Sequence, residues 1–146
     1  MSGLAALLAG HDEPGVYTWH SAARVPDVQH AVEHAGWKFV YLDGWTIEDE
    51  SSFRKAAAAA LHAPDDSGAS FEALSQCLGQ VDCGQANGVV LLWDGWSPYA
   101  RQDEASFGRA LDVLAGRTDP GRGCTFAVLL RGEGPPIDVP ELPHKS

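Results

Sequence analysis

Residues 88–95 read GVVLLWDG, an unbroken apolar run that ends in a polar turn. A strand covered on both faces has this pattern, because neither face needs polar side chains. Two further segments have the same character, KFVYLDG at residues 38–44 and CTFAVLLRG at residues 124–132. The three segments predict the strands of one mainly parallel sheet. Residues 15–19, GVYTW, could add a short strand on the N-terminal side.

Helical patterns lie between these strands. Apolar residues recur at helical spacing over residues 25–36, 49–63, 71–81 and 103–116. The second of these segments contains a run of alanines, which favours a helix strongly, and Pro64 ends it. Strands that alternate with helices predict a small α/β domain in which helices pack on the sheet.

The composition is that of a soluble globular protein. The chain has 146 residues, of which 45% are hydrophobic and 21% charged, and no apolar run approaches the roughly 20 residues that span a bilayer. Its start lacks the basic region and cleavage site of a signal peptide, so we expect a cytoplasmic protein. We divide it into an N-terminal segment that need not be ordered (1–13), one domain (14–131) and a proline-rich, extended or disordered tail (132–146).

The three cysteines, Cys77, Cys83 and Cys124, are an odd number and contain no C-x-x-C pair. A disulfide framework and a four-cysteine zinc site are therefore both unsupported. Cys77 and Cys124 fall in apolar stretches, where a reduced cysteine behaves as a small hydrophobic residue. We expect reduced thiols.

The net charge of −10 argues against nucleic acid as a partner, since nucleic acid requires a basic patch. Residues 43–82 hold eight acidic residues and two basic ones, a local charge of −6. Such a charge either serves solubility alone or favours and accelerates the encounter with a basic partner. The sequence predicts neither a membrane nor a nucleic-acid partner.

Motifs of catalysis are weak or missing. HAVEH at residues 30–34 fits one form of zinc protease motif, and His30 and His34 can share a helix face. The apolar pattern puts both histidines on the outer face, and no close third ligand follows. There is no G-x-S-x-G motif, no P-loop and no G-x-G-x-x-G motif. We predict no enzyme, no metal and no cofactor.

Asp-Gly-Trp occurs twice, at residues 43–45 and 94–96, each time just after an apolar strand. The pattern predicts turns at strand ends with tryptophan rings packed over the edge of the sheet. Aromatic rings beside carboxylates are also typical of protein interfaces. Most of these rings should belong to the core, and Trp45 is the one that we expect to be partly exposed.

The segment DDSGASFEALSQCL, residues 65–78, starts as a polar turn and continues as an amphipathic helix. Ser70 is a predicted N-cap, and Glu72 lies in the first turn, where the helix dipole favours negative charge. The core-facing positions are Phe71, Leu74, Leu78 and Val81. The opposite face is small and polar and consists of Glu72, Ser75, Gln76 and Gly79.

The order of these pieces resembles the barstar family of intracellular ribonuclease inhibitors, most closely its longer members from high-GC Gram-positive bacteria. The resemblance covers roughly residues 14–131. Its most specific part is residues 68–78, where the family typically reads F/Y-G-x-N-W/L-D-A-L-x-D-C-L. The matching residues are Gly68, Ala73, Leu74, Cys77 and Leu78, with Glu72 in place of aspartate. Cys77 and Cys124 also fall where barstar has its cysteines.

The resemblance implies a barstar-like α/β fold with a mainly parallel three-stranded sheet. It also implies a protein that blocks the active site of a secreted guanyl-preferring ribonuclease through an acidic loop and helix. The implied contact residues are Asp66, Gly68, Ser70, Glu72, Ser75, Gln76 and Gly79.

Several positions depart from the family pattern. Ser67 replaces an aromatic residue, Ser70 replaces asparagine, and Gln76 replaces the aspartate that enters the phosphate site of the enzyme. These departures leave an alternative open, a diverged interaction or toxin-immunity module that no longer inhibits a barnase-type ribonuclease.

Overall fold

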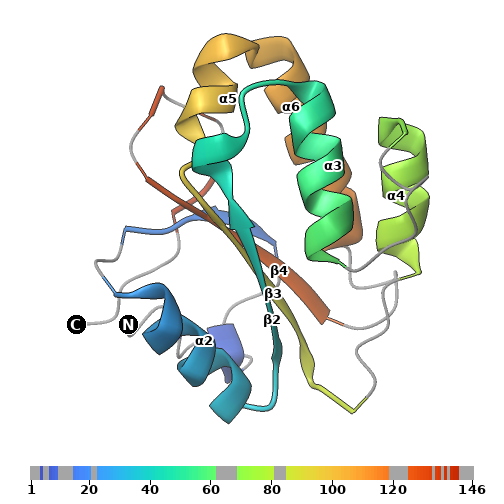
Figure 1. The fold of residues 1–146 in the computed structure, drawn as a ribbon. Coiled ribbons are helices and arrows are strands. Elements are labelled where there is room, and N and C mark those ends of the chain that lie inside the picture. Colours follow the sequence, from blue (N-terminus) through green and yellow to red (C-terminus); the bar gives the residue numbers. More distant parts are fainter. Residues whose placement is uncertain are drawn as a thin grey trace.

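Among the residues that the computed structural model describes, four parallel strands form one sheet in the order β1-β4-β3-β2 (Figure 1). The strands are β1 (Val16–Thr18), β2 (Lys38–Asp43), β3 (Gly88–Asp94) and β4 (Thr125–Arg131). The described residues are 4, 7–9, 15–20, 23–61, 69–80, 85–118, 125–132, 134–135, 137 and 139–141. The predicted α/β class, the parallel sheet and the extra N-terminal strand are confirmed.

The two most apolar strands occupy the middle of the sheet. β3 pairs with β4 on one side and with β2 on the other, and every residue of β3 except Asp94 is buried. β4 is buried from Phe126 to Leu130. This arrangement follows from the sequence, because strands without polar positions are stable only where helices cover both faces.

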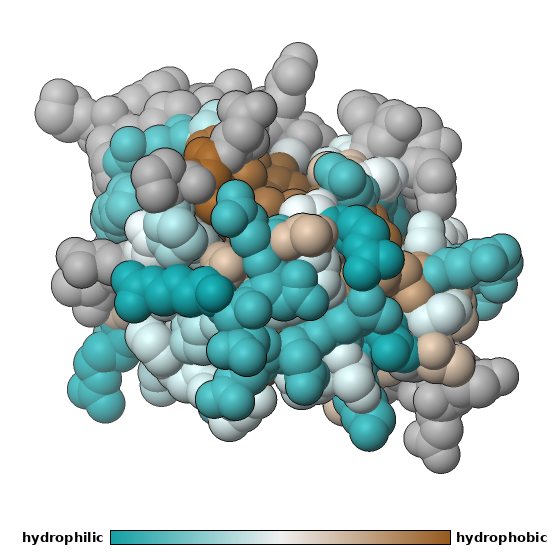
Figure 2. All heavy atoms as spheres, turned by 90° about the horizontal axis from the view of Figure 1, so that it is seen from above, coloured by the Kyte–Doolittle hydropathy of each residue, from teal (hydrophilic) through white to brown (hydrophobic). Residues whose placement is uncertain are grey.

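Helices cover the two faces unequally. On one face lie α3 (Glu50–Ala60), α4 (Phe71–Gly79), α5 (Ser97–Gln102) and α6 (Glu104–Arg117), whereas α2 (Val25–His34) lies on the other (Figure 1). Alternate residues of each strand serve the two sides. Leu91 and Val128 join the core under α3 to α6, and Val90 and Leu129 join the core under α2. Seen from above, hydrophobic residues occupy only a small part of the surface (Figure 2).

Most element bounds agree with the predicted segments, and α5 is the helix that the sequence pattern did not predict. This six-residue helix begins with a proline in its first turn and ends one residue before the N-cap of α6, Asp103. It is too short to show helical periodicity. Burial of Tyr99 and Ala100 against the core holds it in place.

The second sheet face is covered by residues that precede β2. Trp19 is 1% exposed and packs with Val28 and Val32 of α2 against the sheet. Leu4 and Leu7, in the predicted N-terminal segment, are each 1% exposed in the same core. The division of the chain at residues 13 and 131 stays a prediction.

The C-terminal tail runs beside β1. The Thr18 N–H donates to the carbonyl oxygen of Pro140 at 2.9 Å, and Thr18 forms an isolated parallel bridge with Glu141. The described part of the tail is therefore extended here and pairs with the outer edge of β1.

His30 and His34 are exposed on α2 with ring centroids 5.9 Å apart. No group of three His, Cys, Asp or Glu side chains among the described residues could hold a metal ion. Within the same residues, no helix is both long enough and apolar enough to cross a membrane.

We expect Trp19→Ala to destabilise the protein by about 3–5 kcal/mol, because it empties a large site in the α2 core. Urea unfolding followed by circular dichroism measures the change. Trp45→Ala is the matched control, since that ring is 59% exposed and its loss should cost much less. Equal destabilisation by the two substitutions would contradict the assignment of Trp19 to a closed core.

A capping box fixes the start of α3. The Asp49 carboxylate accepts from the Ser52 N–H at 2.8 Å, and the Ser52 hydroxyl accepts from the Asp49 N–H at 3.2 Å. The backbone hydrogen bond from Ser52, followed by that from its hydroxyl, lowers the pKa of Asp49 below its usual 3.8. Ionised Asp49 therefore stabilises the fold above that usual pKa, and this contribution is lost as the pH falls through the lower, folded-state pKa.

Asp49→Asn should make folding less sensitive to acid, because an amide oxygen can still cap the helix and does not titrate. The measurement is urea unfolding from pH 5 to pH 2 for both proteins. Between those limits the wild type should lose more stability than the variant. Parallel curves for the two proteins would contradict a role for Asp49 ionisation.

Candidate partner-binding surface

The α4 helix presents the predicted contact residues on one side. Glu72, Gln76 and Gly79 are exposed, and Ser75 is half-buried beside them. Ser70, exposed at the N-cap, completes this group, which we name the α4 surface: Ser70, Glu72, Ser75, Gln76 and Gly79. Asp66 and Gly68, predicted to belong to the same surface, lie outside the described residues.

The opposite side of α4 enters the core. Leu74 and Leu78 are 0% and 1% exposed, and Phe71 is partly buried, in agreement with the predicted apolar face. Val81 lies outside the described residues. A nine-residue helix is marginal by itself in water, so this buried side decides which residues α4 shows to a partner.

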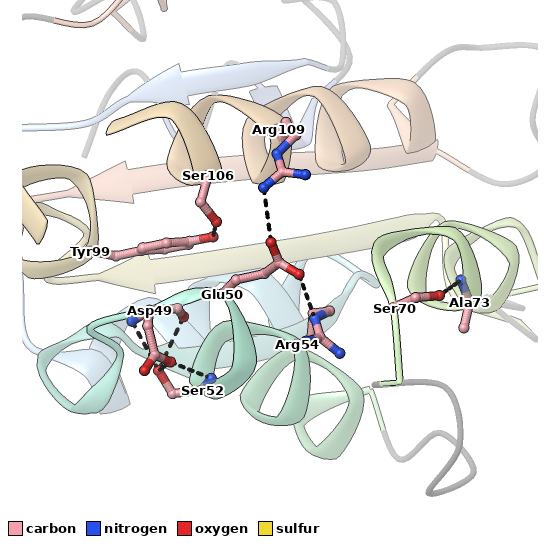
Figure 3. Close-up of polar contacts among 9 residues, drawn as sticks. All are labelled: Asp49, Glu50, Ser52, Arg54, Ser70, Ala73, Tyr99, Ser106 and Arg109. Carbon is pink, nitrogen blue, oxygen red and sulfur yellow. Dashed lines mark hydrogen bonds and ion pairs between the residues drawn. The ribbon is translucent and has the colours of Figure 1, made fainter. Parts of the chain in front are cut away.

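The first turn of α4 is capped as the sequence predicted. The Ser70 hydroxyl accepts from the Ala73 N–H at 3.0 Å (Figure 3). Glu72 follows in the first turn, near the positive end of the helix dipole. The cap fixes the backbone of this turn, and the side chain of Glu72 remains exposed to a partner.

Side chains from α3 and α6 hold the N-terminal half of α4. The Phe71 ring lies 6.2 Å from that of Phe53, and the guanidinium of Arg109 lies 5.4 Å from the centre of the Phe71 ring. Glu50 joins the two supporting helices, since its carboxylate contacts Arg109 at 3.0 Å and Arg54 at 3.2 Å (Figure 3).

A buried arginine holds the other end of α4. Arg117, in the last turn of α6, is 1% exposed, and its Nε donates to the carbonyl oxygen of Leu78 at 2.7 Å. Its guanidinium also lies 5.1 Å from the centre of the Phe126 ring. The last carbonyls of a helix have no partner within the helix and carry partial negative charge, so a buried cation is well placed there.

Sequence reasoning missed Arg117, although a signal was present. The residue falls at helical spacing after Ala110 and Leu114, on the apolar face of α6. A charged residue in that register is rarely buried without a partner, which makes it a candidate for an internal role.

The predicted acidic region from residue 43 to residue 82 does not form one surface in its described part. Asp49 caps α3, Asp43 caps the 3₁₀ turn η1 (Gly44–Thr46), and Glu50 pairs with two arginines. On the α4 surface, Glu72 is the carboxylate, and its neighbours supply hydroxyl and amide groups. The Glu72 carboxylate can accept hydrogen bonds from a partner, and the neighbouring hydroxyl and amide groups can both donate and accept them.

The model of the family described as barstar (barnase inhibitor) matches residues 37–131. The chain belongs to the barstar family. No match is found among curated proteins. The region matched to barstar starts just before β2 and ends with β4, so it contains α4 and the helices that support it, whereas β1 and α2 precede it. In this member of the family, α2 and Trp19 cover the second face of the sheet.

We expect Arg117→Met to lower the free energy of unfolding by about 1.5–3 kcal/mol, because the Leu78 carbonyl loses a charged donor in a buried place. Amide hydrogen exchange should also be faster in the variant than in the wild type, and the acceleration should be larger in α4 than in α2. Arg101→Met is the matched control, since that arginine is exposed on α5 and its replacement should change stability by no more than about 0.5 kcal/mol. If both variants lose equal stability, Arg117 is not the anchor of α4.

Proposed function

We propose that this protein binds a guanyl-preferring ribonuclease and blocks its active site with the α4 surface, together with Asp66 and Gly68 from the preceding loop. The observation that carries the proposal is the family match, which spans α4 and both helices that hold it. Barstar is named as a barnase inhibitor. The exposure of Glu72, Gln76 and Gly79 along one side of α4 supports the same use of this helix.

Charge complementarity favours this partner. A ribonuclease cleft carries arginine, lysine and histidine to hold phosphates, whereas this chain has a net charge of −10. Opposite charges speed the encounter and fix the orientation of the complex. In the proposed complex Glu72 takes a place that a phosphate of RNA would occupy. The protein acts by occlusion, without a cofactor and without catalysis, in the cytoplasm of the producing cell.

Gln76 favours a second candidate function. In barstar the matching aspartate enters the phosphate site of the enzyme, and a neutral amide cannot pair there with cations. An amide can still donate and accept hydrogen bonds. The alternative is therefore a barstar-fold interaction or toxin-immunity module whose target is a different nuclease.

The test is inhibition of RNA cleavage by a panel of secreted guanyl-preferring ribonucleases, with Glu72→Ala and Gln76→Asp beside the wild type. We expect stoichiometric inhibition by the wild type. Glu72→Ala should weaken it about ten- to a hundredfold, because a hydrogen bond to a charged group contributes about 1.5–3 kcal/mol. Added salt should also weaken inhibition, because it screens exposed charges.

Glu33→Ala is the matched control, because it removes one exposed carboxylate from α2 on the other face of the sheet. It should leave inhibition unchanged. If the wild type is inert and Gln76→Asp inhibits, the scaffold is intact and the target has changed, which favours the second candidate. If no variant inhibits any enzyme of the panel, the inhibitor proposal fails for these targets.

A further inference from the structure

The two Asp-Gly-Trp turns meet at the carboxyl end of the sheet. Asp43 of β2 and Asp94 of β3 are partners in the parallel register. In the next position Gly44 packs so closely on Gly95 that an added Cβ would lie 2.2 Å from the Gly95 carbonyl oxygen. The repeated motif is therefore a contact between two strand ends that only glycine permits.

The two tryptophans of these turns have opposite environments. Trp96 is 3% exposed and stacks on Phe107 with ring centroids 5.5 Å apart. Trp45 is 59% exposed. A Cβ built on Gly95 would meet the Cδ2, Cε2 and Nε1 atoms of Trp45 at 2.5–2.8 Å, so one face of the indole lies over that glycine. Since 59% of Trp45 is exposed, the side of the indole away from Gly95 is the one that solvent can reach.

Tyr41 and Trp45 are the large hydrophobic residues that are exposed within the described part of the chain, and both belong to this strand end. The Tyr41 hydroxyl donates to Asp94 at 3.5 Å, and burial, then the charges of Asp94 and Asp43, raise its pKa. Arg131 neutralises Asp94 through two hydrogen bonds, of 3.1 and 3.0 Å. Asp43, two residues before the exposed ring in the sequence, is the other carboxylate at this strand end.

The sequence segment around Trp45 carries charge of one sign. Residues 39–53 contain Asp43, Glu48, Asp49 and Glu50 and no lysine or arginine. Asp43 lies at the start of the same turn, because its Oδ1 accepts from the backbone N–H of Trp45 at 3.2 Å. An open indole face next to a carboxylate attracts a cation, and a guanidinium can stack on the ring while it binds the carboxylate.

We propose that Trp45 and Asp43 form a second binding site, which takes an arginine side chain from a protein partner. The site is separate from the α4 surface, because α3 lies between them (Figure 1). Its negative charge disfavours nucleic acid and anionic lipid, so the ligand is a basic protein segment. The site does not depend on the proposed ribonuclease inhibition and could act at the same time as α4.

The test measures binding of a dye-labelled hexa-arginine peptide to the full chain at low salt, by fluorescence anisotropy. Trp45→Leu keeps an apolar side chain without the indole face and should weaken binding about two- to fivefold. Asp43→Asn keeps the oxygen that caps η1, removes the charge and should weaken binding to a similar extent. Hexa-lysine should bind more weakly than hexa-arginine, because an ammonium group does not stack. The indole N–H signal of Trp45 should shift during the titration.

Two controls separate this site from general attraction to an acidic protein. Glu33→Gln removes the same charge from the exposed face of α2, and Glu104→Gln removes it from the exposed start of α6. Neither should change hexa-arginine binding by more than the measurement error. The proposal is overturned if Trp45→Leu binds as tightly as the wild type, or if Glu33→Gln weakens binding as much as Asp43→Asn does.

Discussion

The fold depends on burying β3 from both sides. Six of its seven residues are buried, so this strand needs a layer of side chains on each face of the sheet. The region matched to barstar supplies one layer through α3 to α6, and the second comes from Trp19 and α2, which precede that region. Burial of large apolar side chains is the main favourable term in folding. The N-terminal unit is therefore part of the same core as the barstar region and cannot be treated as an appendage.

Packing on this core determines the position of the α4 surface. α4 packs mainly against α3 and α6. The Phe71 ring fixes its first turn, and the bond from Arg117 to the Leu78 carbonyl fixes its last. Because both ends of α4 are held in place, its polar side chains are not needed to position the helix and are available to contact a partner. A short helix with one buried, supported side and one exposed polar side suits recognition better than structural support.

The sequence predicted most of the fold and the polar side of α4. Unbroken apolar runs identified β3 and β4, and helical periodicity identified the polar side of α4, because both signals are local along the chain. Arg117 and the pair of Glu50 with Arg109 were missed as supports because these partners lie far away in sequence and meet only when the helices pack together on the sheet. α5 was missed because six residues are too few to show a period. The contact roles of Asp66 and Gly68 remain predictions from the family resemblance.

Trp45 shows how a turn can be both structural and exposed. The glycines at the two strand ends are needed for the strands to meet, and that contact leaves a flat glycine surface on which an indole can lie. The same sequence motif buries Trp96, because the chain there continues into α5 and turns the ring onto Phe107. The motif alone therefore does not decide exposure; the element that follows it does. After β2 the chain leaves through η1 toward an acidic capping box, and this path keeps Trp45 open and beside negative charge.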